Sequence, residues 1–352
     1  MFSVRLCLFG LVWATVATAG QLPTEPDAMF DAFCAVCHGE DGRGQVENPA
    51  IDSEPMDFTD CAVATPEPDA DWQLVITHGG LAAGLSSEMP SYGDALTDGQ
   101  IQALIGYIRG FCAEPGWPIG TLNFPRAIFT EKAFPENEFL LLPEFSDGAD
   151  GVTRFGLRAI YERRLGRRGH VELRVPGESV SAAGERHSGL GDVKLAGKYV
   201  VNTDRAMTRI TTVGLEVSLP TGDEDDGLGH GTAVFEPYLA FGTTLGDLYL
   251  QTQLKVESPA SDPVSDAELG YNVYVGFDLS EFLTTWTLGL ELNGVARDLA
   301  LTPQLRKGLT RTGAIAVASG VQIPLTNRDV RRVRWVGYFL WEYLDPVFAV
   351  KN

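Results

Sequence analysis

Two hydrophobic periodicities divide this chain. In its first third, apolar residues recur at the spacing of a helix, most clearly at positions 101, 104, 105 and 108, which share one helical face. Thr97 stands before this face as an N-cap, and Gln100 completes a capping box with it. The pattern predicts a helix over 97–108 and shorter helices at 27–33 and 71–77, so we expect a small all-α N-terminal region.

From Glu138 onward the period changes to two, the spacing of a strand with one apolar and one polar face. Each of roughly twelve segments reaches or approaches the length of about 9 to 11 residues that a tilted membrane strand requires. The strands are expected at 138–145, 152–165, 169–176, 191–203, 207–220, 233–245, 247–257, 268–280, 283–297, 299–308, 312–325 and 331–344.

The connections between these strands alternate in length. Short turns near 166–168, 202–204, 245–247 and 280–282 alternate with long polar loops at 177–190, 221–232 and 258–267. In an antiparallel up-and-down barrel this puts the long loops at one end, as in outer-membrane barrels, and an even strand number puts both termini at the other. A soluble β-sandwich would show a similar alternation, but the long strands and the aromatics near their ends favour the barrel.

Several strands carry charged side chains on their polar face, and these side chains are expected to point into the barrel. Their mixed signs predict a wet lumen crossed by ion pairs, and mutual neutralisation is a simpler role for each than a selectivity filter. The inward candidates are Arg154, Arg158, Glu162, Glu172, Arg174, Lys194, Glu216, Glu236, Lys255, Glu257, Glu291, Arg306, Arg334 and Glu342.

Charge and composition support two domains. The chain has a net charge of −20, and Gly20 to Pro118 holds 17 acidic residues against Arg43 and Arg109, a net charge of −15. A Pro- and Gly-rich stretch at 114–118 marks the boundary. We expect a helical domain over 20–118, a linker over 119–137 and the barrel over 138–352. The acidic balance argues against nucleic-acid binding.

The first 19 residues have the pattern of a signal peptide for export. Arg5 precedes an apolar run over 6–16, and small residues at 17–19 form a cleavage pattern. The alternative is a membrane anchor, but the run is shorter than the roughly 20 apolar residues of a spanning helix. Cleavage would also remove Cys7.

Cys34-Ala35-Val36-Cys37-His38 carries the clearest chemistry of the chain. Two thiols three positions apart can each form a thioether with one haem vinyl group, and the adjacent imidazole can bind the iron. The alternatives are a redox dithiol, which has no need of the histidine, and half of a zinc site, for which no second C-x-x-C exists. One covalent haem c is therefore predicted, attached at Cys34 and Cys37, with His38 as proximal ligand.

The order of helix, attachment motif, Met89-Pro90 loop and final helix resembles the small monohaem class I cytochromes c, over about 27–112. The resemblance implies that Met89 is the second axial ligand of the haem iron, and His–Met ligation favours electron transfer. Met56 and His78 remain alternatives. Met56 precedes the second helix, and the glycines after His78 suggest a helix end.

Cys61 and Cys112 remain once the haem thiols are assigned. An exported protein meets an oxidising compartment, so a disulfide between them is predicted, with two buried free thiols as the alternative.

The second region resembles the outer-membrane, transporter-like barrels associated with phenol-degradation pathways. The likeness lies in 189–199, in Leu219-Pro220-Thr221-Gly222-Asp223 and in the glycines and histidine at 227–231. It implies a barrel and says little about cargo. The chain departs from the usual outer-membrane pattern because it ends in Val350-Lys351-Asn352 instead of an aromatic residue.

Other candidate sites are weaker. The acidic run Asp223-Glu224-Asp225-Asp226 could bind a cation, but it lacks EF-hand spacing, so a solvated loop is preferred. His170, His187 and His230 show no metal-site spacing and are expected at the surface. The chain has no hydrolytic or transferase motif.

A haem domain fused to a barrel resembles the cytochrome-porin fusions of iron-oxidising bacteria. That likeness implies single-electron transfer at the outer membrane, possible iron oxidoreductase activity, and a cation such as ferrous iron or a periplasmic electron-transfer protein as partner. The acidic domain would attract either a cation or a basic protein. Two alternatives are a small-molecule channel capped by a periplasmic cytochrome and a barrel that only tethers an electron carrier.

Overall fold

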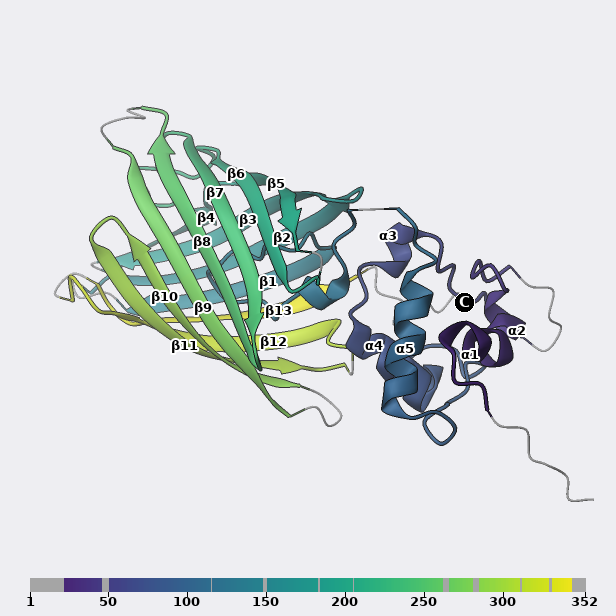
Figure 1. The fold of residues 1–352 in the computed structure, drawn as a ribbon. Helices are drawn as coiled ribbons and strands as arrows, with labels where there is room; N and C mark the ends of the chain where they lie inside the picture. The colour runs from purple at the N-terminus through teal and green to yellow at the C-terminus, as the bar shows by residue number, and fades with distance from the viewer. Residues whose placement is uncertain are drawn as a thin grey trace, which may run out of the picture.

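The computed structural model describes residues 22–45, 51–114, 116–147, 151–182, 184–204, 206–261, 266–280, 285–310, 312–328 and 331–343. A small helical domain and a long β-barrel stand end to end (Figure 1). The expected signal peptide, Cys7 and the chain end at 350–352 lie outside the described residues. Among the described residues, no helix combines the length and the apolar character that crossing a membrane would take.

The helical domain packs around one apolar core. The predicted capping box is present at the start of its longest helix, where Thr97 and Gln100 each bond the other's backbone. The four apolar positions predicted to share a face of that helix are all buried. The helical elements are α1 (Pro26–Phe33), α2 (Ala35–His38), α3 (Cys61–Ala64), α4 (Asp69–His78), η1 (Gly80–Ala83), α5 (Asp98–Arg109) and, beyond the domain, η2 (Gly120–Leu122).

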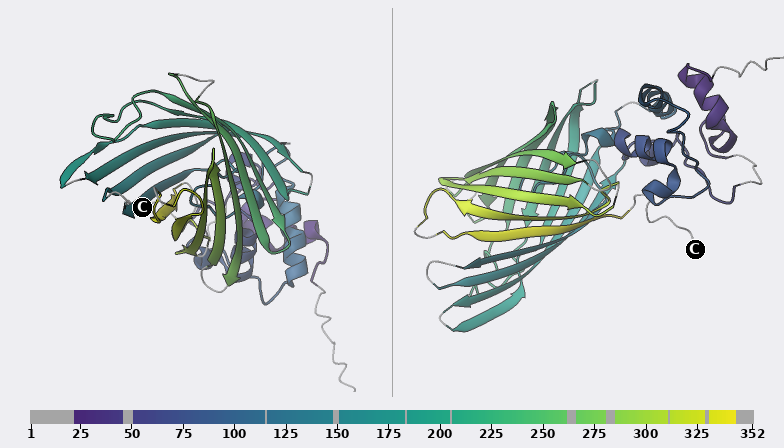
Figure 2. Two further views of the ribbon diagram at one scale, coloured as in Figure 1. Left: turned by 90° about the vertical axis from the view of Figure 1, so that its left-hand side faces the viewer. Right: turned by 90° about the horizontal axis from the view of Figure 1, so that it is seen from below.

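The second region is a closed antiparallel barrel. β1 pairs with β2 on one side and with β13, the last strand, on the other, so the ring of strands is closed (Figure 2). The strands are β1 (Glu138–Asp147), β2 (Thr153–Leu165), β3 (Gly169–Ala182), β4 (Glu185–Leu190), β5 (Lys194–Thr203), β6 (Arg209–Ser218), β7 (Val234–Leu245), β8 (Leu248–Pro259), β9 (Glu268–Ser280), β10 (Trp286–Val295), β11 (Asp298–Gly308), β12 (Ile315–Pro324) and β13 (Arg334–Glu342).

Twelve strand positions form the ring, because β4 and β5 share one of them. The first part of β3 pairs with β5, and its second part, from Gly177, pairs with β4. The long polar loop predicted at 177–190 is therefore wrong. Residues 177–182 of β3 pair with β4, whose residues are mostly exposed, and this hairpin extends the barrel wall.

The barrel wall alternates as the sequence predicts. Large apolar side chains such as Leu157, Leu290 and Trp335 point outward and are more than a third exposed. Five predicted inward carboxylates are buried: Glu162, Glu172, Glu216, Glu236 and Glu291. Because every strand is paired and the outer wall is apolar, the barrel meets the requirements for spanning a bilayer.

The segment between the domains lies inside the barrel. Residues 119–137, which we call the lumen segment, leave the helical domain, enter the near end of the barrel and reach β1 from within. Its side chains at Arg126, Thr130, Lys132 and Phe134 are buried, and only its start forms a short helix, η2. The lumen is therefore partly filled by chain, and the prediction of a simple wet lumen needs this correction.

Candidate functional site

The attachment motif bridges two short helices of the helical domain. Cys34 ends α1 and precedes α2, while Cys37 and His38 belong to α2. The Nδ1 atom of His38 lies 3.3 Å from the carbonyl oxygen of Met56. A carbonyl can only accept, so Nδ1 carries the proton and Nε2 keeps a lone pair for a ligand. The ring of His38 stacks on Phe58 at 4.4 Å between centroids.

Burial favours the uncharged forms of Cys34 and His38. It raises the pKa of the Cys34 thiol to about 12, and the neighbouring Cys37 adds to that shift. It also lowers the pKa of His38, against the smaller opposing effect of the hydrogen bond to Met56. A neutral imidazole is the form that binds iron.

Met89 sits on a tightly bonded loop. The backbone N–H of Gly80 donates to the carbonyl of Met89 at 3.0 Å. A Cβ at Gly80 would lie 2.2 Å from the carbonyl oxygen of Ser86, so only glycine allows this approach. The side chain of Met89 packs against the core that contains Met29, Phe30 and Cys34.

The residue before Met89 fixes the same loop from its other side. The carboxylate of Glu88 accepts from the backbone N–H groups of Asp52 and Ser53 at 2.8 and 2.9 Å, and from the Ser53 hydroxyl. These hydrogen bonds, that of Asp52 first, lower the pKa of Glu88 to about 2. Of the alternative ligands, Met56 packs against the same core as Met89, and its backbone carbonyl binds His38, whereas His78 is exposed at the end of α4.

The structure contains a disulfide between Cys61 and Cys112, with the sulfurs 1.95 Å apart. It joins α3 to the residues just after α5. Arg109 of α5 crosses the same region and donates to the carbonyl of Ala64 and to the carboxylate of Asp69, at 2.6 and 2.7 Å. Cys34 and Cys37 are the free cysteines among the described residues.

Three arginines of the barrel rim hold the helical domain in place. They lie at the end of β2 and in the turn that follows it. Arg168 donates to the carbonyl of Gly116 at 2.9 Å, and the guanidinium of Arg164 lies 5.0 Å from the ring centre of Trp117. The third, Arg167, pairs with Glu114 at 3.2 Å.

Backbone contact between the domains is equally close. The N–H of Gly120, at the start of the lumen segment, donates to the carbonyl of Thr65 at 2.7 Å. A Cβ at Gly120 would lie 1.9 Å from the carbonyl oxygen of Pro66, so the two backbones touch at this point.

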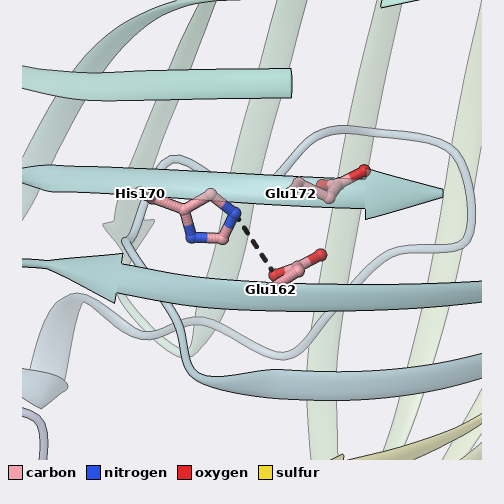
Figure 3. Close-up of side chains that lie close together, drawn as sticks. All are labelled: Glu162, His170 and Glu172. Carbon is pink, nitrogen blue, oxygen red and sulfur yellow. Dashed lines mark ion pairs between the residues drawn. The ribbon is translucent and has the colours of Figure 1, made fainter. Parts of the chain in front are cut away.

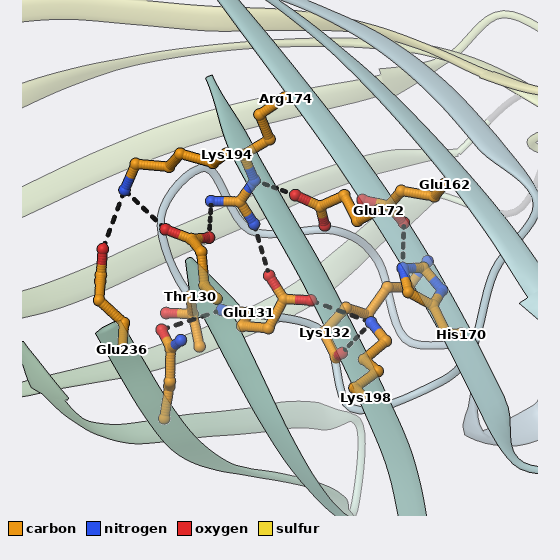
Figure 4. A network of polar contacts seen from close by, with 12 residues as sticks. Thr130, Glu131, Lys132, Glu162, His170, Glu172, Arg174, Lys194, Lys198 and Glu236 are labelled. Carbon is orange, nitrogen blue, oxygen red and sulfur yellow. Dashed lines mark hydrogen bonds and ion pairs between the residues drawn. The ribbon is translucent and has the colours of Figure 1, made fainter. Parts of the chain in front are cut away.

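Inside the barrel, charged side chains of the lumen segment pair with the wall (Figure 4). Arg126 lies 2.8 Å from Glu138 and 2.6 Å from Glu162. Glu131 pairs with Lys198 at 2.9 Å and with Arg174 at 3.1 Å. All but Arg174 are buried, so these pairs are shielded from solvent.

One wall carboxylate holds the turn of the lumen segment. Glu291 of β10 accepts from the backbone N–H groups of Ile128, Phe129 and Thr130 at 2.7, 3.1 and 2.8 Å, and from the Thr130 hydroxyl at 2.9 Å. Further wall side chains, among them Thr212 and Tyr338, donate to carbonyls of the segment. Side chains of the wall thus supply hydrogen-bond partners for the backbone of the lumen segment, which forms no strand of its own.

His170 lies in this interior, so its predicted place at the surface is wrong. It shares the inner face of β2 and β3 with Glu162 and Glu172 (Figure 3). Its Nδ1 accepts from the backbone N–H of Glu136 at 3.1 Å, so Nε2 carries the proton and faces Glu162 at 3.8 Å. A metal ion would need that nitrogen deprotonated, and the group therefore does not fit a cation site.

The remaining histidines stay near the far end of the barrel. His187 pairs with Asp226 of the acidic loop at 2.7 Å, and His230 with Asp192 at 2.8 Å. Two cavities of about 310 and 390 Å³ lie inside the barrel, and the first is floored by residues 126–131. Both are lined by Arg158, Arg174, Lys194 and Arg334, all predicted to face inward.

Comparison with known proteins divides the chain at the same place. Residues 21–108 match the family model of cytochrome c oxidase, cbb3-type, subunit III, and residues 147–300 match that of the putative MetA-pathway of phenol degradation. The chain joins a cytochrome c domain to a barrel of the phenol-degradation type. No curated protein matches it.

Several solved barrels are similar to the second domain. The COG4313 outer membrane channel from Pseudomonas putida F1 is 15% identical, with 62% of this chain and 99% of that chain covered and a TM-score of 0.45. The KdgM porin is 13% identical, with 58% and 99% covered and a TM-score of 0.40. The NanC porin is 11% identical, with 57% and 97% covered and a TM-score of 0.40. The closed ring and the apolar outer wall place this barrel in the outer membrane.

A cytochrome c domain implies haem c, and the described residues fit that group. Two free thiols stand at the start of α2 and within it, a carbonyl orients His38 so that Nε2 can bind iron, and Met89 packs against the core that contains Cys34. Thiols, imidazole and thioether are the donors that haem c uses.

Sequence reasoning missed the lumen segment as a functional element. It assigned 119–137 as a linker and gave no role to Arg126, Glu131 or Lys132. A signal was present, because residues 127–134 are too apolar for a linker in water and follow neither a helical nor a strand period.

Proposed function

We propose that this protein transfers single electrons at the periplasmic face of the outer membrane. Cys34 and Cys37 would hold one haem c through thioethers, and His38 and Met89 would bind its iron. The observation that carries the proposal is the hydrogen bond of His38 to Met56, because it presents Nε2 beside two free thiols in a core that also contains Met89.

The barrel acts as the anchor of this redox centre. α1 and α2 lie on the side of the cytochrome domain that faces away from the barrel (Figures 1 and 2). The lumen segment also fills the near end of the lumen. Both observations favour electron exchange with a partner in the periplasm over transfer through the barrel.

The ligand assignment is tested by replacing the thioether. Met89→Ala should remove the weak sulfur-to-iron absorption band and lower the reduction potential, because a soft thioether stabilises ferrous iron. Met56→Leu is the matched control, since it keeps the carbonyl that binds His38, and its spectrum should stay unchanged. An unchanged spectrum for Met89→Ala would reject the assignment.

The site of electron exchange is tested in liposomes. Protein is inserted with the cytochrome domain outside, and haem reduction is followed after adding a basic cytochrome or ferrous iron outside. Rapid oxidation or reduction by a basic cytochrome, slowed by salt, supports the proposal. Haem that responds only to a redox reagent enclosed within the liposomes would show that electrons pass through the barrel instead.

A further inference from the structure

Three arginines on one side of the barrel lumen have too few acidic partners. Arg158 of β2 and Arg334 of β13 lie 3.0 and 3.5 Å from the same oxygen of Glu144, so two guanidinium groups share one carboxylate. Arg154 lines the same side and forms no ion pair among the described residues. Glu178 also lines this side and offsets one positive charge. Three basic groups thus face two acidic ones, which leaves an excess of one positive charge.

The neighbouring wall of β3 and β5 has no such excess. Arg174 pairs with three carboxylates and Lys194 with two, and Glu216 belongs to both sets (Figure 4). Mutual neutralisation therefore explains the charges of that wall. It does not explain the arginines beside Glu144, which make the lumen locally positive in a chain whose net charge is −20.

Two of these arginines keep donors that an anion can use. The Nε–H of Arg158 is buried and has no hydrogen-bond partner among the described residues. Arg334 donates through Nε and Nη2 to the amide oxygen of Gln322, a neutral acceptor, at 3.2 and 2.7 Å. A guanidinium binds a carboxylate more strongly than it binds a neutral oxygen, because charge strengthens both of the parallel hydrogen bonds that the pair can form. A carboxylate in the lumen would therefore be favoured at both arginines.

Apolar side chains lie next to these donors in the same cavity. The cavity of about 310 Å³ is lined by Arg158 and Arg334 and also by Ile128, Phe129 and Leu142. The guanidinium of Arg334 lies 5.1 Å from the ring centre of Phe129. A small cavity that combines apolar walls with a few convergent polar groups is typical of a small-molecule site.

We propose that this cavity binds a small organic anion, with its carboxylate between Arg158 and Arg334 and its apolar body against Phe129 and Ile128. The binding is separate from electron transfer and does not depend on the haem. Glu144 acts as an internal competitor, because it occupies donors of both arginines that the ligand would use.

The ligand would enter from the end of the barrel that lies away from the cytochrome domain. The second cavity, of about 390 Å³, shares four basic side chains with the first and is also lined by residues 227–230 of the loop at that end. An excess of positive charge between low-dielectric walls attracts anions along this route.

Calorimetric titration of the full-length protein in detergent micelles tests the site, with benzoate as the probe. Benzoate should bind saturably. Benzamide, which has the same ring without the charge, and inorganic phosphate, which has charge without an apolar body, should each bind at least about tenfold more weakly, since each lacks one half of the interaction.

Variants assign the residues. Arg158→Gln and Arg334→Gln should each weaken benzoate binding about tenfold, because a charge-assisted pair is lost. Arg209→Gln is the matched control, since Arg209 is exposed at the other end of the barrel and should leave the affinity unchanged. Glu144→Gln should tighten binding about threefold, because both arginines lose their competitor. Heat-modifiable migration and haem absorbance verify that each variant is folded.

The effect of Glu144→Gln separates a ligand site from a purely structural ion pair. A structural pair predicts no gain in affinity when its acid is removed, so unchanged or weaker benzoate binding in this variant would overturn the proposal. Equal binding of benzoate and benzamide, or of benzoate and phosphate, would overturn it as well, as would an arginine variant that binds benzoate like the control.

Discussion

Arg126 offers the sharpest test of how the lumen segment is held. Its guanidinium lies within 2.8 Å of Glu138 and 2.6 Å of Glu162, and both carboxylates are fully buried. Arg126→Met keeps much of the apolar stem and removes the charge. The native barrel would then enclose carboxylates that have lost their cation.

The two carboxylates are not affected equally. Glu138 keeps Lys132 at 2.9 Å, whereas Glu162 keeps only the neutral His170 at 3.8 Å. Breaking a buried pair costs about 3 to 5 kcal/mol, and the cost here should fall at the lower end, about 3 kcal/mol, because one acid stays paired. Adding Glu162→Gln to Arg126→Met should recover about half of the loss, since the orphaned charge is then gone.

Equilibrium unfolding in urea measures this difference. Protein in detergent micelles is scored by the heat-modifiable gel band of the folded barrel, and free energies come from the midpoints. Arg43→Ala is the control, because the exposed pair of Arg43 with Asp41 should contribute less than about 1 kcal/mol. A loss for Arg126→Met as small as that of the control, or no recovery in the double variant, would refute the reasoning.

Three predictions concern the cytochrome domain. Cys112→Ser should destabilise it by about 4 kcal/mol, since the bond to Cys61 closes a loop of 51 residues, and thermal melting would show this. Gly80→Ala should lower the reduction potential, measured by redox titration, because its Cβ would push the Ser86 carbonyl and the methionine loop. Burial, followed by nearby acids, raises the pKa of Glu67 to about 8, above its value in the unfolded chain. The folded state therefore holds more protons from about pH 4.5 to 8, so stability should fall as pH rises through that window. Glu67→Gln should flatten this slope in melts between pH 5 and 9.

Each of these has an outcome that would contradict it. If Cys112→Ser melts at the same temperature as the native protein, the Cys61–Cys112 disulfide contributes nothing to stability. Gly99→Ala is the control and should keep the native reduction potential, because no atom lies near its Cβ. A native reduction potential for Gly80→Ala would mean that the methionine loop accommodates the added methyl group without moving the ligand. A pH slope that Glu67→Gln leaves unchanged would assign the slope to other groups.

Local sequence patterns predicted much of the secondary structure and the haem motif of this protein. The period of two along 138–343 predicted the strands, because each residue of a barrel wall faces either lipid or lumen whatever its distant neighbours are. The capping box at Thr97 likewise needs only residues three positions apart. Cys34, Cys37 and His38 could be proposed as haem-binding residues for the same reason, since covalent haem attachment depends on their spacing along the chain.

Features that depend on distant neighbours could not be read this way. The hairpin at 177–190 is an exception, because Ala182 pairs with Glu185 and the contact is local. It was missed because the residues of β4 are mostly polar and exposed. His170 was expected at the surface, but its place on the inner face of β3 put it beside Glu162 and the backbone of Glu136.

The lumen segment shows the difference most clearly. The sequence by itself determined two domains, the haem motif and a barrel with charges facing inward, since each follows from local spacing. Only the tertiary structure decided that 119–137 lies within the barrel. That placement depends on Glu291, Glu162 and Lys198, which come from three separate strands and meet the segment only once the ring has closed.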